Sequence, residues 1–376
     1  MVIASKDRVP KGEEDSEIPK RKKSRAETLG TLRKAYPWAF LIAMLAFFTV
    51  ASQAMNNVNF LSPRALQGIA LYATQILLLA LGETLIIITA GIDLSVGWTL
   101  GFSSVIGADI MKYLYASGAG PIETIGLGML GGISVAVLPG LLSGLLLTRW
   151  NVPSFISTLA VGFIVEGVAL LRSHGYPIAE QPPYLGDLGN GSILNWSPGN
   201  WFTWFQVPET ATSIQLQANI PLMPNVVLVT IIVTAICWFI LAKTQFGQHL
   251  YAIGGNLEAA KRAGIPVART LIKVYILSSI LAGVAGVLWA ARFTSGAYNG
   301  GETTQMTSIA AVVIGGASLF GGEGTIVGTV VGALVIATIQ YGLVVIGVEN
   351  FYQYVVVGAV LILAVVVDQL GRALNK

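Results

Sequence analysis

The chain has 376 residues, of which 54% are hydrophobic and only 11% are charged. Soluble domains carry a charge on about a quarter of their residues, so this composition excludes most soluble folds. Residues 1–37 hold ten Lys/Arg and six Asp/Glu, a large share of the 41 charges in the chain. The composition therefore predicts a membrane domain that follows a short polar tail.

The tail contains the basic run KRKKSR at Lys20–Arg25. This run allows two interpretations: an arm that binds a partner or nucleic acid, or a segment attracted to anionic lipid headgroups. We favour the lipid interpretation and expect no nucleic-acid partner, because the basic residues lie just before the first apolar run. Residues 1–37 are therefore predicted to be a disordered cytoplasmic tail.

Residue counts also exclude several kinds of chemistry. The one cysteine, Cys237, has no partner for an internal disulfide. One cysteine and two histidines, His174 and His249, are also too few to build a His/Cys metal cluster. The chain has neither a Gly-Lys-Ser/Thr phosphate loop nor a His-Glu-x-x-His motif. We therefore expect no metal, no cofactor and no catalytic residue, so the chain is predicted not to be an enzyme.

Apolar runs that are long enough to cross a membrane occur at about ten places. If the N-terminus is cytoplasmic and all ten cross, the inside segments collect 18 Lys/Arg and the outside segments only four. This asymmetry agrees with the positive-inside rule and predicts that both termini are cytoplasmic. Two of the runs, 304–320 and 323–346, leave an alternative, since they could form a re-entrant pair instead of two full spans. The ten runs are 38–54, 66–89, 94–116, 123–148, 153–172, 223–242, 271–291, 304–320, 323–346 and 350–368.

The predicted organisation is thus an all-α polytopic domain over 38–370 with a short cytoplasmic C-terminus at 371–376. Two connections are long. Residues 173–222 lie outside and contain no Lys or Arg, while residues 243–270 lie inside and are basic. Long loops in compact proteins are often functional.

Glycines in the apolar runs recur at four-residue spacing. This spacing lets helix backbones approach closely in lipid, where the hydrophobic effect cannot hold helices together. It predicts a tightly packed helix bundle but identifies no function. The clearest examples are Gly97 with Gly101, and Gly324 with Gly328 and Gly332.

The stretch 82–101 reads GETLIIITAGIDLSVGWTLG. Gly91 is expected to end one helix, and Asp93 is placed to cap the next by accepting from the amide of Ser95 or Val96. A charge between two apolar runs is unfavourable unless it is capped or solvated. Asp93 and Ser95 are therefore candidates either for a structural cap or for the lining of a pathway.

The stretch 245–270 contains a short helix that is marked at both ends. Gly254 and Gly255 predict a turn, Asn256 is a good N-cap, and residues 257–263 form two helical turns with Glu258 near the positive end. Gly264 is a natural residue for the helix stop, and a proline follows it. A loop helix with the small residues Ala259 and Ala260 is suited to docking another protein rather than to lying on a bilayer.

Four motifs in collinear order resemble the permease subunits of bacterial ABC importers for monosaccharides, such as ribose, xylose and galactose. They are GIDLSVG at Gly91–Gly97, VPSFISTLAVG at Val152–Gly162, FGQHLYAIGGNLEAAKRAGI at Phe246–Ile265 and IAAVVIGGASLFGGEGTIVGTVVGALV at Ile309–Val335. The resemblance covers roughly residues 60–370.

The resemblance implies a type II ABC importer fold with about ten helices in the bacterial inner membrane. It implies a homodimeric pore that works with cytoplasmic ABC ATPase subunits, which bind the ATP, and with a periplasmic sugar-binding protein. By position, Glu258, Ala259, Ala260 and Gly264 resemble the coupling helix that enters a groove on the ATPase.

Two departures from similar permeases concern acids inside the apolar runs. Glu166 stands where similar permeases often carry Arg or a neutral residue, and Glu83 replaces a more usual neutral residue. Acids within the membrane are candidates for the translocation pathway, although a hydrogen-bonded structural role is equally open. Asn299, Glu302 and Gln305 are expected at the outer mouth, where they could receive a polar solute.

The external loop 173–222 is longer than the resemblance implies and contains Trp196, Trp201 and Trp204 with Asp187 and Glu209. It allows two interpretations, an added contact for the binding protein or an aromatic belt at the membrane interface.

A second functional class stays open beside the ABC permease. An ion-coupled secondary transporter would use Glu83 and Glu166 as coupling sites. That class explains the acids, but it explains neither the capped helix at 257–263 nor the lack of obvious inverted repeats. A membrane enzyme is less suitable still, because the runs contain no metal-binding or nucleophilic constellation.

Overall fold

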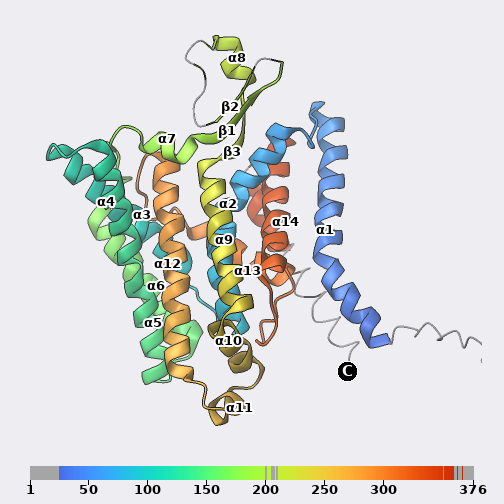
Figure 1. Ribbon diagram of the computed structural model, residues 1–376, viewed down its shortest axis with the longest axis vertical. Helices are drawn as coiled ribbons and strands as arrows, with labels where there is room; N and C mark the ends of the chain where they lie inside the picture. The colour runs from blue at the N-terminus through green and yellow to red at the C-terminus, as the bar shows by residue number, and fades with distance from the viewer. Residues whose placement is uncertain are drawn as a thin grey trace, which may run out of the picture.

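The computed structural model describes residues 25–199, 201–204, 208, 211–349, 351–359, 362 and 366. Most of these residues are helical, and the long helices run roughly parallel to one another in a single bundle (Figure 1). Among these described residues, seven helices are long and apolar enough to cross a membrane: Ala35–Asn56, Pro63–Ile88, Pro121–Arg149, Ser154–Ser173, Asn225–Lys243, Val267–Phe293 and Ile326–Val345.

These seven helices coincide with seven of the ten predicted runs, so the chain is a polytopic helical membrane protein. The helices that carry them are α1 (Arg25–Asn56), α2 (Pro63–Ile88), α4 (Pro121–Val135) with α5 (Val137–Arg149), α6 (Ser154–Ser173), α9 (Asn225–Lys243), α12 (Val267–Phe293) and α14 (Ile326–Val345). The helix α1 begins within the predicted tail; residues 1–24 lie outside the described residues.

The other three runs differ from the seven. The run 94–116 is α3 (Val96–Ala116), which has the length of a membrane span but is less apolar. The run 304–320 is cut short, because α13 (Glu302–Ile314) has 13 residues, about 20 Å of helix against a hydrocarbon core of about 30 Å. The run 350–368 is helical over 351–359, and most of its remainder lies outside the described residues. The predicted number of ten spans therefore stays a prediction.

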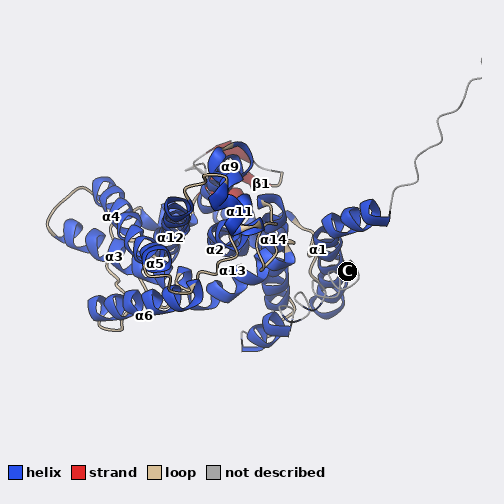
Figure 2. Ribbon diagram, turned by 90° about the horizontal axis from the view of Figure 1, so that it is seen from below, coloured by secondary structure: helices blue, strands red, loops and turns tan. Residues whose placement is uncertain are grey.

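The middle of the bundle is formed by α2, α12, α13 and α14, and α3 packs against α12 (Figure 2). The second half of α2 is buried on all sides, with Leu78–Leu81 and Leu85–Ile88 exposing 1% or less of their surface. A helix that is apolar around its whole circumference belongs in such a position. Figure 2 shows α1 at one edge of the bundle, α4 at the opposite edge, and α9 and α6 on the two remaining sides.

Glycines hold the central elements close together. A β-carbon on Gly97 would stand 2.6 Å from the carbonyl oxygen of Gly301, and one on Gly101 would stand 1.8 Å from that of Tyr298. The α13–α14 pair packs in the same way, with Gly332 against the carbonyl of Ala311 and Gly328 against that of Gly315. Gly324 lies in the turn before α14 and not in the helix, so its part in the predicted four-residue series was wrong.

The loop 173–222, which the sequence analysis predicts to be external, contains strands, so the prediction of a purely α-helical fold was wrong for this segment. It contains α7 (Leu185–Asn190), α8 (Ser213–Ala218) and an antiparallel sheet in the order β2-β1-β3, made of β1 (Ser192–Ser197), β2 (Trp201–Trp204) and β3 (Ile220–Pro224). The carbonyls of Gln217 and Asn219 accept from Arg64 at the start of α2, which ties this layer to the bundle. Figure 1 shows the strands at one end of the bundle, here called the strand end.

The opposite end of the bundle carries two short helices, α10 (Gln245–Gly255) and α11 (Leu257–Arg262) (Figure 1). They fill most of the connection between α9 and α12, which is the basic loop 243–270 of the sequence.

Candidate functional site

The helix α11 is capped at both ends by the residues that the sequence marks. The Asn256 side chain accepts from the backbone N–H of Ala259 at 2.9 Å. At the other end, Gly264 adopts a φ of +78°, the N–H of Gly264 donates to the carbonyl of Lys261 at 3.0 Å, and that of Ile265 donates to the carbonyl of Ala260 at 3.1 Å. These two bonds form a Schellman motif, which requires a left-handed residue such as glycine after the helix. The short helix is therefore a rigid unit.

One side of α11 is open to solvent. Glu258 and Ala259 are exposed, and Glu258 forms an exposed ion pair with Lys261 at 2.8 Å. Ala260 is only 3% exposed and packs inward. Of the two alanines, only Ala259 is exposed in this chain, so the predicted docking face does not present both of them. The exposed side of α11 thus carries the acid Glu258, the base Lys261 and the small residue Ala259. The helix projects beyond the end of the bundle (Figure 1).

The neighbouring glycines form a joint between the α11 end and the core. Gly254 and Gly255 are the last residues of α10, not a turn, because Asn256 ends one helix and begins the next. The carbonyl of Ile88, at the end of α2, accepts from the N–H of Gly322 at 2.8 Å. A β-carbon on Gly254 would stand 1.7 Å from that carbonyl oxygen and 2.6 Å from the Gly322 nitrogen. Three backbone segments therefore meet here without side chains between them, and we call this contact the glycine joint.

The predicted residues Glu83, Asp93 and Ser95 lie together inside the bundle, directly beyond the glycine joint. All three expose none of their surface. Asp93 accepts from the N–H of Ser95 at 2.8 Å and from its hydroxyl at 2.6 Å, so the predicted bond to the Ser95 amide is present. The N-cap of α3 is Ser95 itself, without a side-chain cap bond, so the prediction that Asp93 caps this helix was wrong. Since none of these side chains reaches the surface of the chain, their part in a pathway stays a prediction.

A second group of predicted residues lies at the surface. Glu166 on α6 is partly exposed, Asn299 and Glu302 are exposed, and the carboxyl groups of Glu166 and Glu302 are close enough to interact electrostatically. The chain thus brings together two acids that are 136 residues apart in sequence. Gln305 is only 4% exposed and packs beside Gly97.

Aromatic side chains lie next to this pair of acids. The rings of Trp98 on α3 and Phe163 on α6 lie 5.1 Å apart, and Gly162 makes room for the Trp98 ring. Phe163 is 59% exposed and Met306 is 50% exposed. We call the surface formed by Trp98, Phe163, Glu166, Asn299, Glu302 and Met306 the α6–α13 face; Figure 2 shows α6 and α13 on the side of the bundle away from α9.

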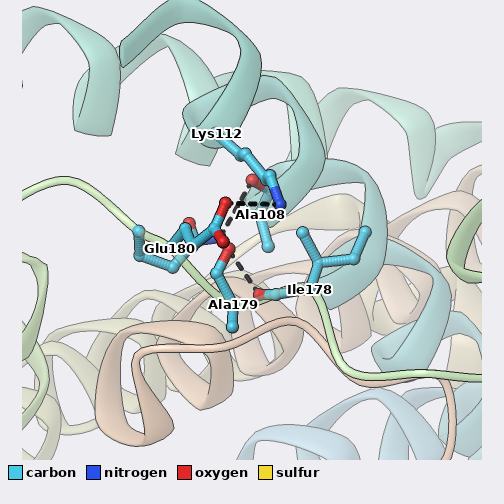
Figure 3. Close-up of polar contacts among 6 residues, drawn as sticks. Ala108, Lys112, Ile178, Ala179 and Glu180 are labelled. Carbon is cyan, nitrogen blue, oxygen red and sulfur yellow. Dashed lines mark hydrogen bonds and ion pairs between the residues drawn. The ribbon is translucent and has the colours of Figure 1, made fainter. Parts of the chain in front are cut away.

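The segment 178–181, here called the strap, makes contacts at the strand end that the sequence did not predict. Ile178 pairs with Gly296 in a short antiparallel bridge, with bonds of 2.8 and 3.0 Å. The amide nitrogen of Gln181 donates to the carbonyl of Ala108 at 3.2 Å. Lys112 forms an ion pair of 2.8 Å with Glu180 (Figure 3). The segment 178–181 therefore joins α3 to the turn that follows α12.

The ion pair of the strap affects the Glu180 carboxyl. The hydrogen bond from Lys112, together with its positive charge, holds the pKa of Glu180 below its ordinary value. Close by, Arg172 donates two hydrogen bonds to Asp109, at 2.8 and 2.5 Å. Lys112 with Glu180 and Arg172 with Asp109 thus form two ion pairs next to each other at this end of the bundle.

No group of three or more His, Cys, Asp or Glu that could hold a metal ion occurs in the part of the chain that the structure describes.

The chain matches the family model of the branched-chain amino acid transport system / permease component over residues 65–365. It is 34% identical over 344 residues to the ribose import permease protein RbsC of Bacillus subtilis, which covers 90% of this chain and 94% of that protein. It is 33% identical to the galactose/methyl galactoside import permease protein MglC of Escherichia coli, covering 92% and 96% of the two chains.

A third relative is the L-arabinose ABC transporter permease protein AraH of Azospirillum brasilense, at 32% identity over 88% of this chain and 87% of that protein. No solved structure matches. The relatives are transport subunits, and with its seven candidate spans this chain is a multi-pass protein of the inner membrane. The match over most of its length shows that the chain belongs to the permease-component family that contains these sugar ABC transporter permeases.

Proposed function

We propose that this chain forms the translocation pathway of an ATP-driven importer for a monosaccharide or a similarly small polar solute. Two copies would build the pathway, separate cytoplasmic ABC ATPase subunits would bind and hydrolyse ATP, and a periplasmic binding protein would deliver the solute. The relatives import ribose, galactose or L-arabinose according to their names, which supports a sugar as the substrate class.

The observation that carries this proposal is the capped helix α11 and its glycine joint. A helix of two turns that is fixed at both ends can transmit a push without bending. Its exposed side offers Glu258, Ala259 and Lys261 to a partner, while Gly254 rests directly on the end of α2. Closure of an ATPase dimer against α11 would therefore move α2, the most buried of the seven candidate membrane spans, as a rigid element.

The α6–α13 face is the observation that supports the proposal of a second copy of the chain. Charged side chains are costly against lipid, so acids on membrane helices face a water-filled cavity or other protein. The half-exposed Glu166 and its neighbour Glu302 lie on a surface that one chain leaves open. Placing two such faces opposite one another would enclose the acids, Asn299 and the Trp98–Phe163 rings in a pathway between the copies. Polar groups beside aromatic rings are suited to a neutral, hydroxyl-rich solute.

The sheet and α8 at the strand end would form the contact for the binding protein. Phe202 and Trp204 of β2 are 54% and 65% exposed, and Ile214 of α8 is 79% exposed. Exposed apolar groups of this size are unusual outside lipid unless another molecule covers them. In the proposed arrangement, both termini and α11 would lie in the cytoplasm and the strand end would lie outside.

The ion-coupled secondary transporter is less well supported. Its two proposed coupling acids lie in different surroundings, since Glu83 is buried beside Asp93 whereas Glu166 is partly exposed beside Glu302. The named relatives are also subunits of import systems rather than lone carriers.

The proposal is tested by purifying the tagged full-length chain from native membranes in mild detergent. We expect an ATPase to co-purify with the wild-type chain and to be lost from the Glu258→Arg sample. The wild type and Glu258→Arg should insert into the membrane equally. Glu123→Arg, at an exposed acid on α4, is the matched control and should retain the ATPase. Equal ATP hydrolysis in the Glu258→Arg and wild-type samples would contradict the role of α11.

A further inference from the structure

Two carboxyl groups lie wholly inside the helix bundle, where α2 meets the turn that leads into α3. Glu83 and Asp93 expose none of their surface and are close enough to interact electrostatically. Across the described residues, no lysine, arginine or histidine forms an ion pair or hydrogen bond with either group. Two negative charges at this position would therefore repel each other without a counter-ion.

The two carboxyl groups are not equivalent. Asp93 accepts two hydrogen bonds from Ser95 and a third, at 3.3 Å, from the Ser278 hydroxyl on α12. It also lies just before the first turn of α3, where the helix dipole favours a negative charge. Both oxygens of Glu83 are buried without a hydrogen-bond partner; the backbone of Asp93 lies nearby but not at hydrogen-bonding geometry. The surroundings thus stabilise an anion at Asp93 and not at Glu83.

A third buried group points to the same place. Tyr275 on α12 is 1% exposed, and its hydroxyl has no hydrogen-bond partner, although the Ser154 side chain lies near it. The hydroxyl is adjacent to the turn that carries Asp93, because a β-carbon on Gly91 would stand 2.7 Å from its oxygen. Both acids lie near it. The acids and this hydroxyl are the titratable groups that meet between α2, the turn and α12.

A buried carboxylate without a hydrogen bond or a counter-ion takes up a proton rather than staying ionised. Unpartnered buried polar groups that lie close together are commonly bridged by an ordered water. We propose that Glu83 is a proton-binding site: its carboxyl is neutral at physiological pH, Asp93 is the anion, and a buried water joins Glu83 to the Tyr275 hydroxyl. The proton comes from solvent during folding and stays with Glu83, so it is not a transported proton.

This site lies directly above the glycine joint. The turn that holds Asp93 starts at Thr89, one residue after Ile88, whose carbonyl supports Gly254 and Gly322. Ionisation of Glu83 would place a second charge against Asp93 and push the turn away from α2. The proton on Glu83 therefore keeps the joint closed in the folded chain. This inference concerns the chain itself and does not rest on the proposed function.

The first test is infrared spectroscopy of the purified full-length chain in lipid nanodiscs. We expect the carbonyl stretch of a protonated carboxylic acid at neutral pH, its loss in Glu83→Gln, and its persistence in Glu166→Gln and Asp93→Asn. A wild-type spectrum without such a band at neutral pH would overturn the proposal. This measurement uses only the wild-type chain, so it does not depend on whether any variant folds. A band that survives Glu83→Gln would overturn it as well.

The second test is the melting temperature of the same chain between about pH 5.5 and about pH 8.5. A proton that is bound in the folded but not in the unfolded chain changes the folding equilibrium tenfold per pH unit, and stability falls as pH rises. Glu83→Gln removes this proton, so its advantage over the wild type should grow with pH. Glu123→Gln, at the exposed acid of α4, should follow the wild-type curve.

Parallel curves for the wild type and Glu83→Gln would contradict proton binding at Glu83. Stabilisation of the wild type by sodium or potassium ions that Glu83→Gln abolishes would assign the site to a metal cation and would overturn the proposal.

Discussion

Gly254 lies so close to Ile88 that a β-carbon on the glycine would stand 1.7 Å from the Ile88 carbonyl oxygen. The first residue belongs to the loop that carries α11, and the second ends α2, the most buried of the seven candidate membrane spans. In the proposed mechanism, motion of α11 would reach α2 through this contact.

Gly254→Ala should open the glycine joint, because the added carbon meets backbone rather than the end of a flexible side chain. Overpacking of this kind destabilises a protein by about 1–3 kcal/mol. We expect ATP hydrolysis to continue in the assembled transporter while solute uptake falls at least tenfold. Gly255→Ala is the matched control, since its β-carbon would meet nothing within 4 Å. Equal uptake by both variants would show that the joint carries no motion.

Asn256→Ala should loosen α11 by removing the side chain that caps it. Loss of an N-cap costs about 1 kcal/mol, which is a large fraction of the stability of a helix of two turns. Asn256→Asp keeps an acceptor for the Ala259 amide and should behave like the wild type. The measurement is hydrogen exchange of residues 257–263; unchanged exchange in Asn256→Ala would contradict the assigned cap.

The α6–α13 face should meet its equivalent in a second copy. In a chain whose Cys237 is replaced by serine, Met306→Cys and Phe163→Cys are expected to form disulfide-linked dimers under mild oxidation. Ile232→Cys is the control, because Ile232 is 50% exposed on α9, on the side of the bundle away from α6 (Figure 2). Cross-links from Ile232 and none from the other two positions would place the partner on the wrong side.

Acid should release the strap at the strand end. The pKa of Glu180 is below its ordinary value in the folded chain, so the ionised carboxyl stabilises the strap above the unfolded pKa of about 4.3. This contribution is lost as pH falls through the lower, folded pKa. The protection factor of residues 176–181, which compares their exchange rate with the intrinsic rate at the same pH, should therefore fall at low pH in the wild type. Glu180→Gln should show a lower protection factor at neutral pH and a smaller change on acidification. Identical profiles would show that the Lys112–Glu180 pair does not hold the strap.

Features that depend on neighbouring residues could be predicted from the sequence. The caps of α11 follow from Asn256 and Gly264, because a cap is formed by residues within one turn of each other. The membrane helices follow from the length of the apolar runs. The early stop of α13 had a signal in Gly315–Gly316, and Gly316 indeed has a φ of +89°.

Features that depend on distant residues could not. The sheet at the strand end pairs β1 with β3 across about 25 residues of polar, Pro- and Gly-containing chain, and such short strands have no strong periodic pattern. The sequence singled out Glu83 and Glu166 as similar cases, yet one is buried beside Asp93 and the other lies at the surface beside Glu302. Only the packing of α2, α6, α12 and α13 separates their roles.

The central claim is that this chain moves a small sugar-like solute when a separate ATPase acts on α11. Its most direct test is uptake of radiolabelled ribose, galactose and arabinose, each with its binding protein, into proteoliposomes that contain the chain and its co-purified ATPase. We predict uptake of at least one of these sugars that requires ATP and is abolished by Glu258→Arg. Uptake by the chain alone, driven by a proton or sodium gradient and indifferent to ATP, would contradict the account.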